Sequence, residues 1–322
     1  IGRTTLGAAA DIIDVGSLAD KRYYMVLGDI KPDGGNIDFF YNLNADTGSN
    51  YATRRSEDGG TDSTVASNAN GIVWGNSNIV NPNFSVGYFS NLSTKEKLNI
   101  SHTVHQTTAG AGTAPLRVES VGKWSNTADA ISTISMKDAG SDQYDSGSEL
   151  VVLGWDESDT HTTNFWEELA SVELGVAGDT IDTGTFTAKK YLWVQIWEKS
   201  TGGATAPNIR FNADSGNNYA RRSSANGGSD STTINQTFID LFAHTNRAAF
   251  SNHFIVNNSS NEKLLIGNEL DQQASGAGTA PTRYEIVGKW ANTSSQITQI
   301  QVINNQSGDF AVGSIIKVWG SD

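Results

Sequence analysis

Short stretches in which apolar residues alternate with polar or turn-forming residues run along the whole chain. Residues 191–197 carry large apolar side chains on both alternating faces, as expected for a strand packed on both sides. Shorter alternations occur at 134–136 and 300–302, and short apolar runs at 150–153 and 315–319. Clusters of Gly, Asn, Asp and Ser separate these stretches every ~8–15 residues, a spacing typical of a sandwich or barrel. The pattern predicts an all-β protein.

The sequence repeats itself once. Residues 44–52 return with few changes at 212–220, an offset of 168 residues. Further along the chain the offset is 166, since Gly-Ala-Gly-Thr-Ala-Pro at 110–115 returns unchanged at 276–281. The first copy therefore carries two extra residues between these matches. A repeat of ~160 residues is too long for a solenoid or propeller unit, so each copy is expected to build its own core.

The offsets predict two tandem antiparallel β-sandwich domains, jelly-roll-like, that arose by internal duplication. The first domain is expected at 1–156, a linker at 157–166 and the second domain at 167–322. Eight to ten strands are expected in each domain, and an immunoglobulin-type sandwich is the alternative. Helical patterns are confined to one turn at 166–170 and a short helix or long loop at 238–250.

Composition and charge exclude several classes of partner. The net charge is −13 and is divided almost evenly between the two copies, so no basic face is expected for nucleic acid or an anionic membrane. The chain has no cysteine, which removes disulfides, thiolate metal sites and cysteine nucleophiles. No apolar run approaches the ~18 residues of a membrane span. We expect neither nucleic-acid binding nor membrane insertion.

The strongest repeated motif is the loop Asn-Ala-Asp-x-Gly-x-Asn-Tyr-Ala. Carboxylate and amide oxygens close together suit Ca²⁺, and Asp or Asn beside Tyr suits a sugar. A hairpin with side-chain caps explains the same residues without a ligand. The candidate binding residues, including the arginine three positions after each Tyr, are Asp46, Asn50, Tyr51, Arg54, Asp214, Asn218, Tyr219 and Arg222. Calcium is left open at Asp46 and Asp214, and no other metal or cofactor is expected.

Other residues that could carry chemistry have simpler explanations. His102 and His105 have the spacing of a ligand pair, but on a strand residues three apart point to opposite faces. The repeated Gly-Lys-Trp segments are expected to place Trp124 and Trp290 in the core at a strand end, with stacking on a sugar ring as the alternative. No nucleophile elbow or zinc-protease motif is present. The chain is therefore not expected to be an enzyme.

Four segments of the second copy, at 209–222, 276–281, 287–293 and 307–320, together resemble repeat modules in virion structural proteins of marine tailed phages and related viruses. The first copy matches less well, for example at 42–43. The resemblance implies a non-enzymatic protein on the particle exterior, as a capsid decoration, turret or tail-fibre component. Its partners would be other virion proteins and copies of itself, in a symmetric homo-oligomer for which analogy favours a trimer over a dimer.

Two other functions stay open beside this virion-surface role. A carbohydrate-binding module for host attachment would show exposed coplanar aromatic rings, and would make a glycan the partner. A glycan-active enzyme would show two carboxylates facing each other across a cleft at ~5–10 Å.

Overall fold

A computed structural model of the chain describes residues 1–75, 80–140, 142–156, 158–160 and 164–322. These residues form two compact units, which are considered separately. The first unit comprises Ile1–Thr107 and Leu116–Thr163, and the second comprises Thr108–Pro115 and Asn164–Asp322. The expected linker at 157–166 includes residues 157 and 161–163, which lie outside the described part of the chain.

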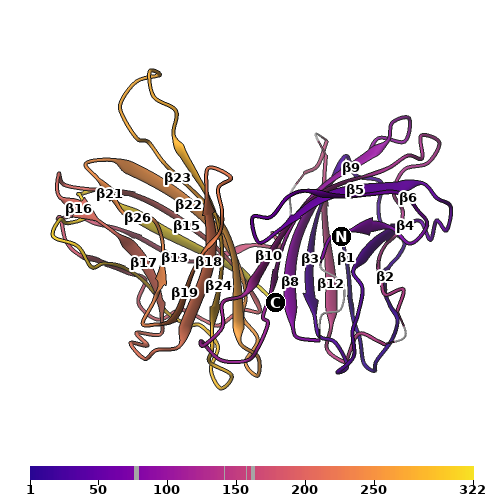
Figure 1. Cartoon of the computed structure of the whole chain (residues 1–322), viewed down its shortest axis with the longest axis horizontal. Helices are drawn as coiled ribbons and strands as arrows, with labels where there is room; N and C mark the ends of the chain where they lie inside the picture. The colour runs from indigo at the N-terminus through magenta and orange to yellow at the C-terminus, as the bar shows by residue number, and fades with distance from the viewer. Residues whose placement is uncertain (76–79, 141, 157, 161–163) are drawn as a thin grey trace. The chain divides into compact units, whose positions relative to one another are not determined.

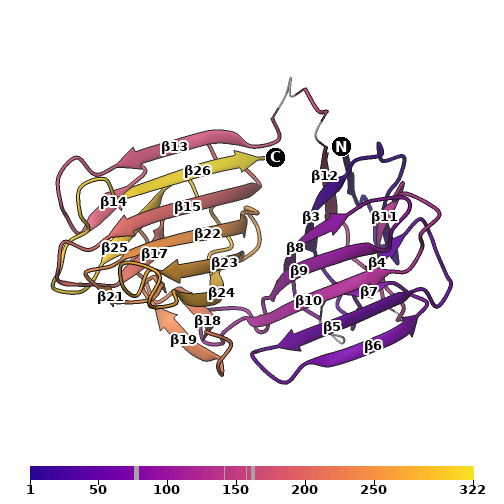
Figure 2. The same cartoon turned by 90° about the horizontal axis from the view of Figure 1, so that it is seen from above.

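The first unit is a sandwich of an eight-stranded and a four-stranded antiparallel sheet (Figures 1 and 2). The larger sheet has the order β1-β12-β3-β8-β9-β10-β5-β6 and the smaller one β2-β11-β4-β7. Its strands are β1 (Gly2–Thr5), β2 (Ile12–Val15), β3 (Tyr23–Ile30), β4 (Phe40–Leu43), β5 (Tyr51–Glu57), β6 (Ser63–Asn68), β7 (Ile72–Val73), β8 (Asn83–Ser90), β9 (Lys97–His105), β10 (Leu116–Trp124), β11 (Ile134–Lys137) and β12 (Glu149–Trp155).

The second unit repeats this plan and adds one small two-stranded sheet, β16-β21. Its larger sheet runs β13-β26-β15-β22-β23-β24-β18-β19 and its smaller one β14-β25-β17-β20 (Figure 2). Its strands are β13 (Glu167–Glu173), β14 (Thr180–Asp182), β15 (Tyr191–Lys199), β16 (Ala204–Thr205), β17 (Pro207–Phe211), β18 (Tyr219–Ala225), β19 (Ser231–Gln236), β20 (Ile239–Asp240), β21 (His244–Thr245), β22 (Ala248–Val256), β23 (Lys263–Asp271), β24 (Thr282–Trp290), β25 (Ile300–Asn304) and β26 (Ile315–Ser321).

Each core lies between the two sheets of its unit. In the first unit, Val26 and Val152 of the larger sheet belong to the same buried cluster as Ile13 and Met136 of the smaller sheet. The residues at the repeat offsets in the second unit form a cluster of the same kind: Val194, Val318, Ile181 and Val302. Alternate residues of each strand point into the cluster because side chains change face at every residue. The predicted pair of duplicated β-sandwiches is confirmed.

Trp124 and Trp290 end β10 and β24, and each is 1% exposed. The expected core position of these rings is therefore confirmed, and the alternative of stacking on a sugar ring is wrong.

Two expectations about secondary structure are wrong. The described residues contain no helix, and twelve strands in one unit and fourteen in the other exceed the expected eight to ten. Four of the five residues expected to form a helical turn at 166–170 belong to β13, which pairs with β26 with one register shift between Glu168 and Ala170. Main-chain pairing at the sheet edge outweighs the weak helical pattern there. The segment at 238–250 holds β20, β21 and the start of β22. In the described residues no helix meets the length and hydropathy needed to cross a bilayer.

Candidate functional site

The repeated loop motif builds a corner between two sheets. Asn44 and Ala45 have φ of 53° and 52°, and the Asp46 N–H donates to the Leu43 carbonyl at 3.0 Å, which closes a tight turn. The Tyr51 hydroxyl accepts from Leu43 N–H and donates to the Leu43 carbonyl, both at 3.0 Å. The expected hairpin is wrong in this respect, because β4 and β5 belong to different sheets.

The carboxylate of the motif is used inside the corner. Asp46 Oδ1 accepts from Gly48 N–H at 2.7 Å, and Oδ2 accepts from the Asn50 side chain at 2.9 Å and the Trp124 indole at 2.6 Å. The second unit repeats these bonds at Asp214, with Gly216 N–H, Asn218 and Trp290 as donors. Tyr51 and Tyr219 are buried. Six of the eight candidate residues therefore form two structural corners.

The sequence leaves calcium open at the two corners, at Asp46 and Asp214. No group of three or more His, Cys, Asp or Glu side chains able to hold a metal ion occurs among the described residues. His102 and His105 lie on opposite faces of β9, as the strand spacing predicts. Burial lowers the pKa of His102 to about 4 and that of His105 to about 3.

Arg54 and Arg222 lie elsewhere, on the outer face of each larger sheet, the face turned away from the smaller sheet of the same unit. Each arginine lies in a row of cross-strand neighbours, and we call six residues of each row the outer row. In the first unit the outer row is Leu153, Met25, Tyr88, Ile100, Val121 and Arg54. In the second unit it is Trp319, Trp193, Phe254, Ile266, Val287 and Arg222. The two rows occupy the same repeat positions.

The outer row of the first unit exposes apolar side chains to solvent. Tyr88 is 40% exposed, Ile100 64% and Val121 47%, and the three are direct neighbours on adjacent strands. Leu98, two residues before Ile100 on β9, is also exposed. Two positions from Met25 on β3 and from Leu153 on β12, the Tyr23 and Trp155 rings stack with centroids 5.9 Å apart and planes 29° apart. Exposed apolar side chains that neighbour one another are typical of binding surfaces.

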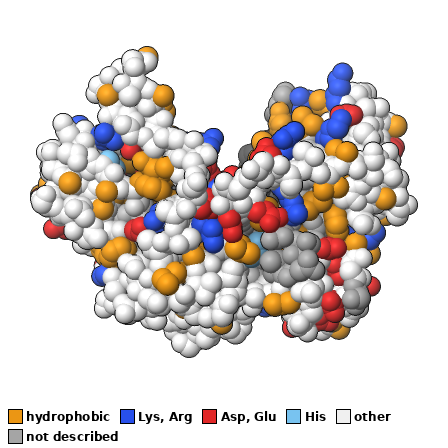
Figure 3. Space-filling view, viewed as in Figure 1, with side chains coloured by type: hydrophobic (Ala, Val, Ile, Leu, Met, Phe, Trp, Pro, Cys, Tyr) orange, Lys and Arg blue, Asp and Glu red, His pale blue; other side chains and the backbone are white. Residues whose placement is uncertain are grey.

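The outer row of the second unit is aromatic at one end. Trp193 stacks between Trp319, at 4.8 Å, and Phe254, at 5.9 Å, and Trp166 lies against Trp193 and Phe254. At the other end of the row Ile266 and Val287 are buried. On the face of the molecule seen in Figure 3, most of the surface is uncharged and small groups of both charges are interspersed.

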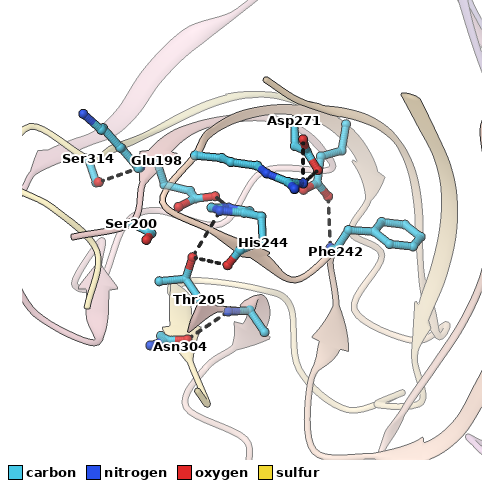
Figure 4. A network of polar contacts seen from close by, with 12 residues as sticks. Glu198, Ser200, Thr205, Phe242, His244, Asp271, Asn304 and Ser314 are labelled. Atoms are coloured by element: carbon cyan, nitrogen blue, oxygen red, sulfur yellow. Dashed lines mark hydrogen bonds and ion pairs between the residues drawn. The ribbon is translucent and has the colours of Figure 1, made fainter. Parts of the chain in front are cut away.

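A buried polar network in the second unit was not found from the sequence (Figure 4). The Glu198 carboxylate contacts His244 Nε2, and His244 Nδ1 lies 3.3 Å from the Thr205 hydroxyl. Glu269 accepts from Phe242 N–H at 3.4 Å, while its second oxygen has no hydrogen-bond partner. Burial raises the pKa of both glutamates. Glu198 and His244 are 46 residues apart, so no local spacing could reveal the contact.

The network has little room for a reacting molecule. Glu198, Ser251 and Glu269 line a narrow space with Ile196, Leu241 and other apolar side chains, and the space is too small to hold a water molecule. The space is closed to a glycan, which a pair of catalytic carboxylates would have to flank.

Comparison with known proteins does not assign the chain to a family. No family model matches it, and no curated protein matches it. Among solved structures, mouse laminin alpha1 domains LG4-5 align over 98% of this chain and 89% of that chain, with 8% identity and a TM-score of 0.20. The attachment invasion locus protein Ail of Yersinia pestis aligns over 84% of this chain and 98% of that chain, with 8% identity and a TM-score of 0.15.

Proposed function

We propose that this chain is a non-enzymatic structural protein of the virion exterior that acts through protein–protein contacts. The observation that carries the proposal is the exposed apolar outer row of the first unit, at Tyr88, Ile100 and Val121. Apolar side chains in contact on a rigid sheet lose little conformational entropy on binding. Full burial of each is worth about 1.5–3 kcal/mol relative to full exposure, so roughly half of that is still available here.

The sequence resemblance supports the particle exterior as the location, and the closed space at Glu198 and Glu269 supports a non-enzymatic role. The duplicated sandwich places an outer row at the equivalent position of each unit, and the row of the first unit exposes Ile100 and Val121 for contact with a partner.

Immunogold electron microscopy tests the location. Antibodies raised against the purified chain are expected to label the outside of intact particles of the phage that encodes it. Preimmune serum is the control. Particles that stay unlabelled when intact, and whose dissociated proteins contain no trace of the chain by mass spectrometry, would refute the virion role.

Carbohydrate binding is a second candidate function, favoured by the stacked and exposed Tyr23 and Trp155 rings. Neighbouring exposed aromatic rings can pack against the face of a sugar ring. A glycan array with the purified chain tests this function, with Trp155→Ala as the variant and Val312→Ala, an exposed apolar position elsewhere, as the matched control. Binding to one glycan class that Trp155→Ala alone abolishes would favour this candidate.

A further inference from the structure

Within the second unit, the segment Thr108–Pro115 packs on the outer row. The segment belongs to this unit by its contacts, although it comes from the first sequence copy. Its Ala111 and Ala114 side chains are buried, at 6% and 7% exposed. Ile266 and Val287 of the row are 3% and 0% exposed. The apolar end of the row is therefore covered in this unit.

Hydrogen bonds hold the backbone of the segment in place. Asn235 N–H donates to the Ala111 carbonyl at 2.9 Å, and Arg222 Nε–H donates to the Pro115 carbonyl at 2.8 Å. Lys289 Nζ donates to the Thr108 carbonyl at 2.7 Å. Most of these bonds reach main-chain atoms, so any segment with the same backbone conformation and small side chains could make them.

A fourth contact involves an ion pair. Gly110 N–H donates to the Glu262 carboxylate, which also lies 3.8 Å from Lys289 Nζ. The side chains of this ion pair are 3% and 0% exposed. Burial lowers the pKa of Lys289.

The first unit carries the same surface on which Thr108–Pro115 packs in the second unit. Five residues of this surface are identical at the equivalent positions of the two copies; in the first copy they are Arg54, Glu96, Ile100, Val121 and Lys123. Lys123 and Glu96 form the equivalent ion pair at 2.9 Å, but here both side chains are more than 40% exposed. Ser67, with φ of 53°, stands in for Asn235, with φ of 51°, so the backbone N–H of the strand is turned in the same way. Five identical side chains are thus covered in one unit and exposed in the other.

The covering segment is repeated as well. Gly110 to Pro115 returns unchanged at 276–281, and Gly110 and Gly276 share a left-handed backbone, with φ of 88° and 83°. Ala277, Ala280 and Pro281 are exposed, whereas their counterparts in the first copy are buried. The second copy therefore presents a binding segment with the sequence and turn of the docked one.

We propose that the segment at 274–281 of one molecule binds the outer row of the first unit of a second copy of this chain. The proposal rests on the proposed function for the view that the outer row is a protein-contact surface. Donor segment and acceptor surface are different, so the contact is heterologous and joins copies head to tail into closed rings or longer arrays. The hydrogen bonds that hold Thr108–Pro115 in the second unit have equivalents in the first unit. We expect the incoming segment to be held by the residues at these equivalent positions, which are Ser67 (through its N–H), Arg54, Lys123 and Glu96.

One eight-residue segment covers less surface than a standard stable interface. The isolated contact should therefore be weak, and it would gain strength where many copies are held together on a particle. Self-association should appear only at high protein concentration.

Sedimentation velocity of the full chain over a wide concentration range tests the proposal. Reversible oligomers are expected at the highest concentrations. Ile100→Glu on the acceptor and Ala277→Glu on the donor should each weaken association by about tenfold or more, because each would bury a charge. Both sites are exposed, so circular dichroism should show an unchanged fold. Val176→Glu, at a position 76% exposed, is the matched control and should associate as the wild type does.

Mixing the two defective variants gives a sharper test. The Ile100→Glu chain keeps its donor segment and the Ala277→Glu chain keeps its acceptor, so the mixture should form dimers of one of each but no longer arrays. A strictly monomeric wild type, or oligomers that neither variant weakens, would overturn the proposal.

Cross-linking identifies the contact, because the natural chain has no cysteine. Ser67→Cys in one chain and Ala277→Cys in another should form a disulfide-linked dimer, since the equivalent Asn235 and Ala111 backbones share a hydrogen bond. In the control experiment, Val176→Cys takes the place of Ala277→Cys. When both cysteines are placed in one chain, an intrachain link alone would show that the chain binds its own segment and would overturn the proposal. The cross-linking and sedimentation results do not depend on immunogold labelling. A failure of the proposed self-association can therefore be distinguished from a failure of the proposed virion role.

Discussion

The indole Nε1–H of Trp124 donates a 2.6 Å hydrogen bond to Asp46 Oδ2, and Trp290 and Asp214 repeat this bond at 2.7 Å. Each bond ties the corner between the two sheets to a ring buried in the core. Burial alone would raise the pKa of Asp46, but the hydrogen bonds from Trp124, Asn50 and Gly48 N–H lower it. The same balance lowers the pKa of Asp214. The repeated motif is therefore a stabilising corner in both units.

Replacing Asp214 with alanine should destabilise the second unit by about 2–3 kcal/mol, because the Trp290 indole would lose its acceptor inside the core. Urea denaturation followed by tryptophan fluorescence measures the loss. Asp309→Ala, at an exposed position, is the control and should change stability by less than ~0.5 kcal/mol. An equally small loss in Asp214→Ala would show that the bond contributes little.

The corners should also make stability depend on acid. The pKa of Asp214 is lowered in the folded state, so its contribution is present above the ordinary aspartate pKa of about 3.9 and is lost as the pH falls through the folded value. The difference in unfolding free energy between the wild type and Asp214→Asn should be largest near neutral pH and shrink below about pH 4. A difference that is constant from pH 7 to pH 3 would contradict this assignment.

Glu269 should oppose folding at neutral pH. Burial raises its pKa well above the ordinary value, and one carboxylate oxygen has no hydrogen-bond partner. The raised pKa stabilises the folded chain below the pKa of an unfolded glutamate, about 4.3. This stabilisation is lost as the pH rises through the pKa of Glu269 in the folded chain. Glu269→Gln should therefore stabilise the chain at pH 7 by about 1–3 kcal/mol and have little effect near pH 4. Thermal melts at both pH values, with the exposed Glu168→Gln as control, measure the effect.

Calcium should leave the melting temperature unchanged. Both oxygens of Asp46 and of Asp214 accept hydrogen bonds from N–H donors, which a cation would have to displace. Melting curves with and without millimolar CaCl₂, with NaCl at matched ionic strength, check this expectation. A saturable rise with calcium, absent in Asp46→Asn and Asp214→Asn, would establish the calcium sites that the sequence leaves open.

The sequence by itself determined the duplication, the all-β class and the place of Trp124 and Trp290 in the core. These follow from local signals, since alternation shows strands, Gly and Asn mark turns, and identical segments at a constant offset show the repeat. Long-range contacts carry no such signal. The contact of Glu198 with His244, and the corner that replaces the expected hairpin, depend on which strands meet and in which sheet. Only the tertiary structure decided these features.

The clearest case is the pair Ile100 and Ile266, identical residues at equivalent positions. The sequence by itself could not distinguish them. Their exposure differs, at 64% and 3%, because Thr108–Pro115 packs over the outer row of the second unit while the row of the first unit lies open. Burial depends on which segments pack against a residue, so only the tertiary structure could show which copy of the surface is free to bind.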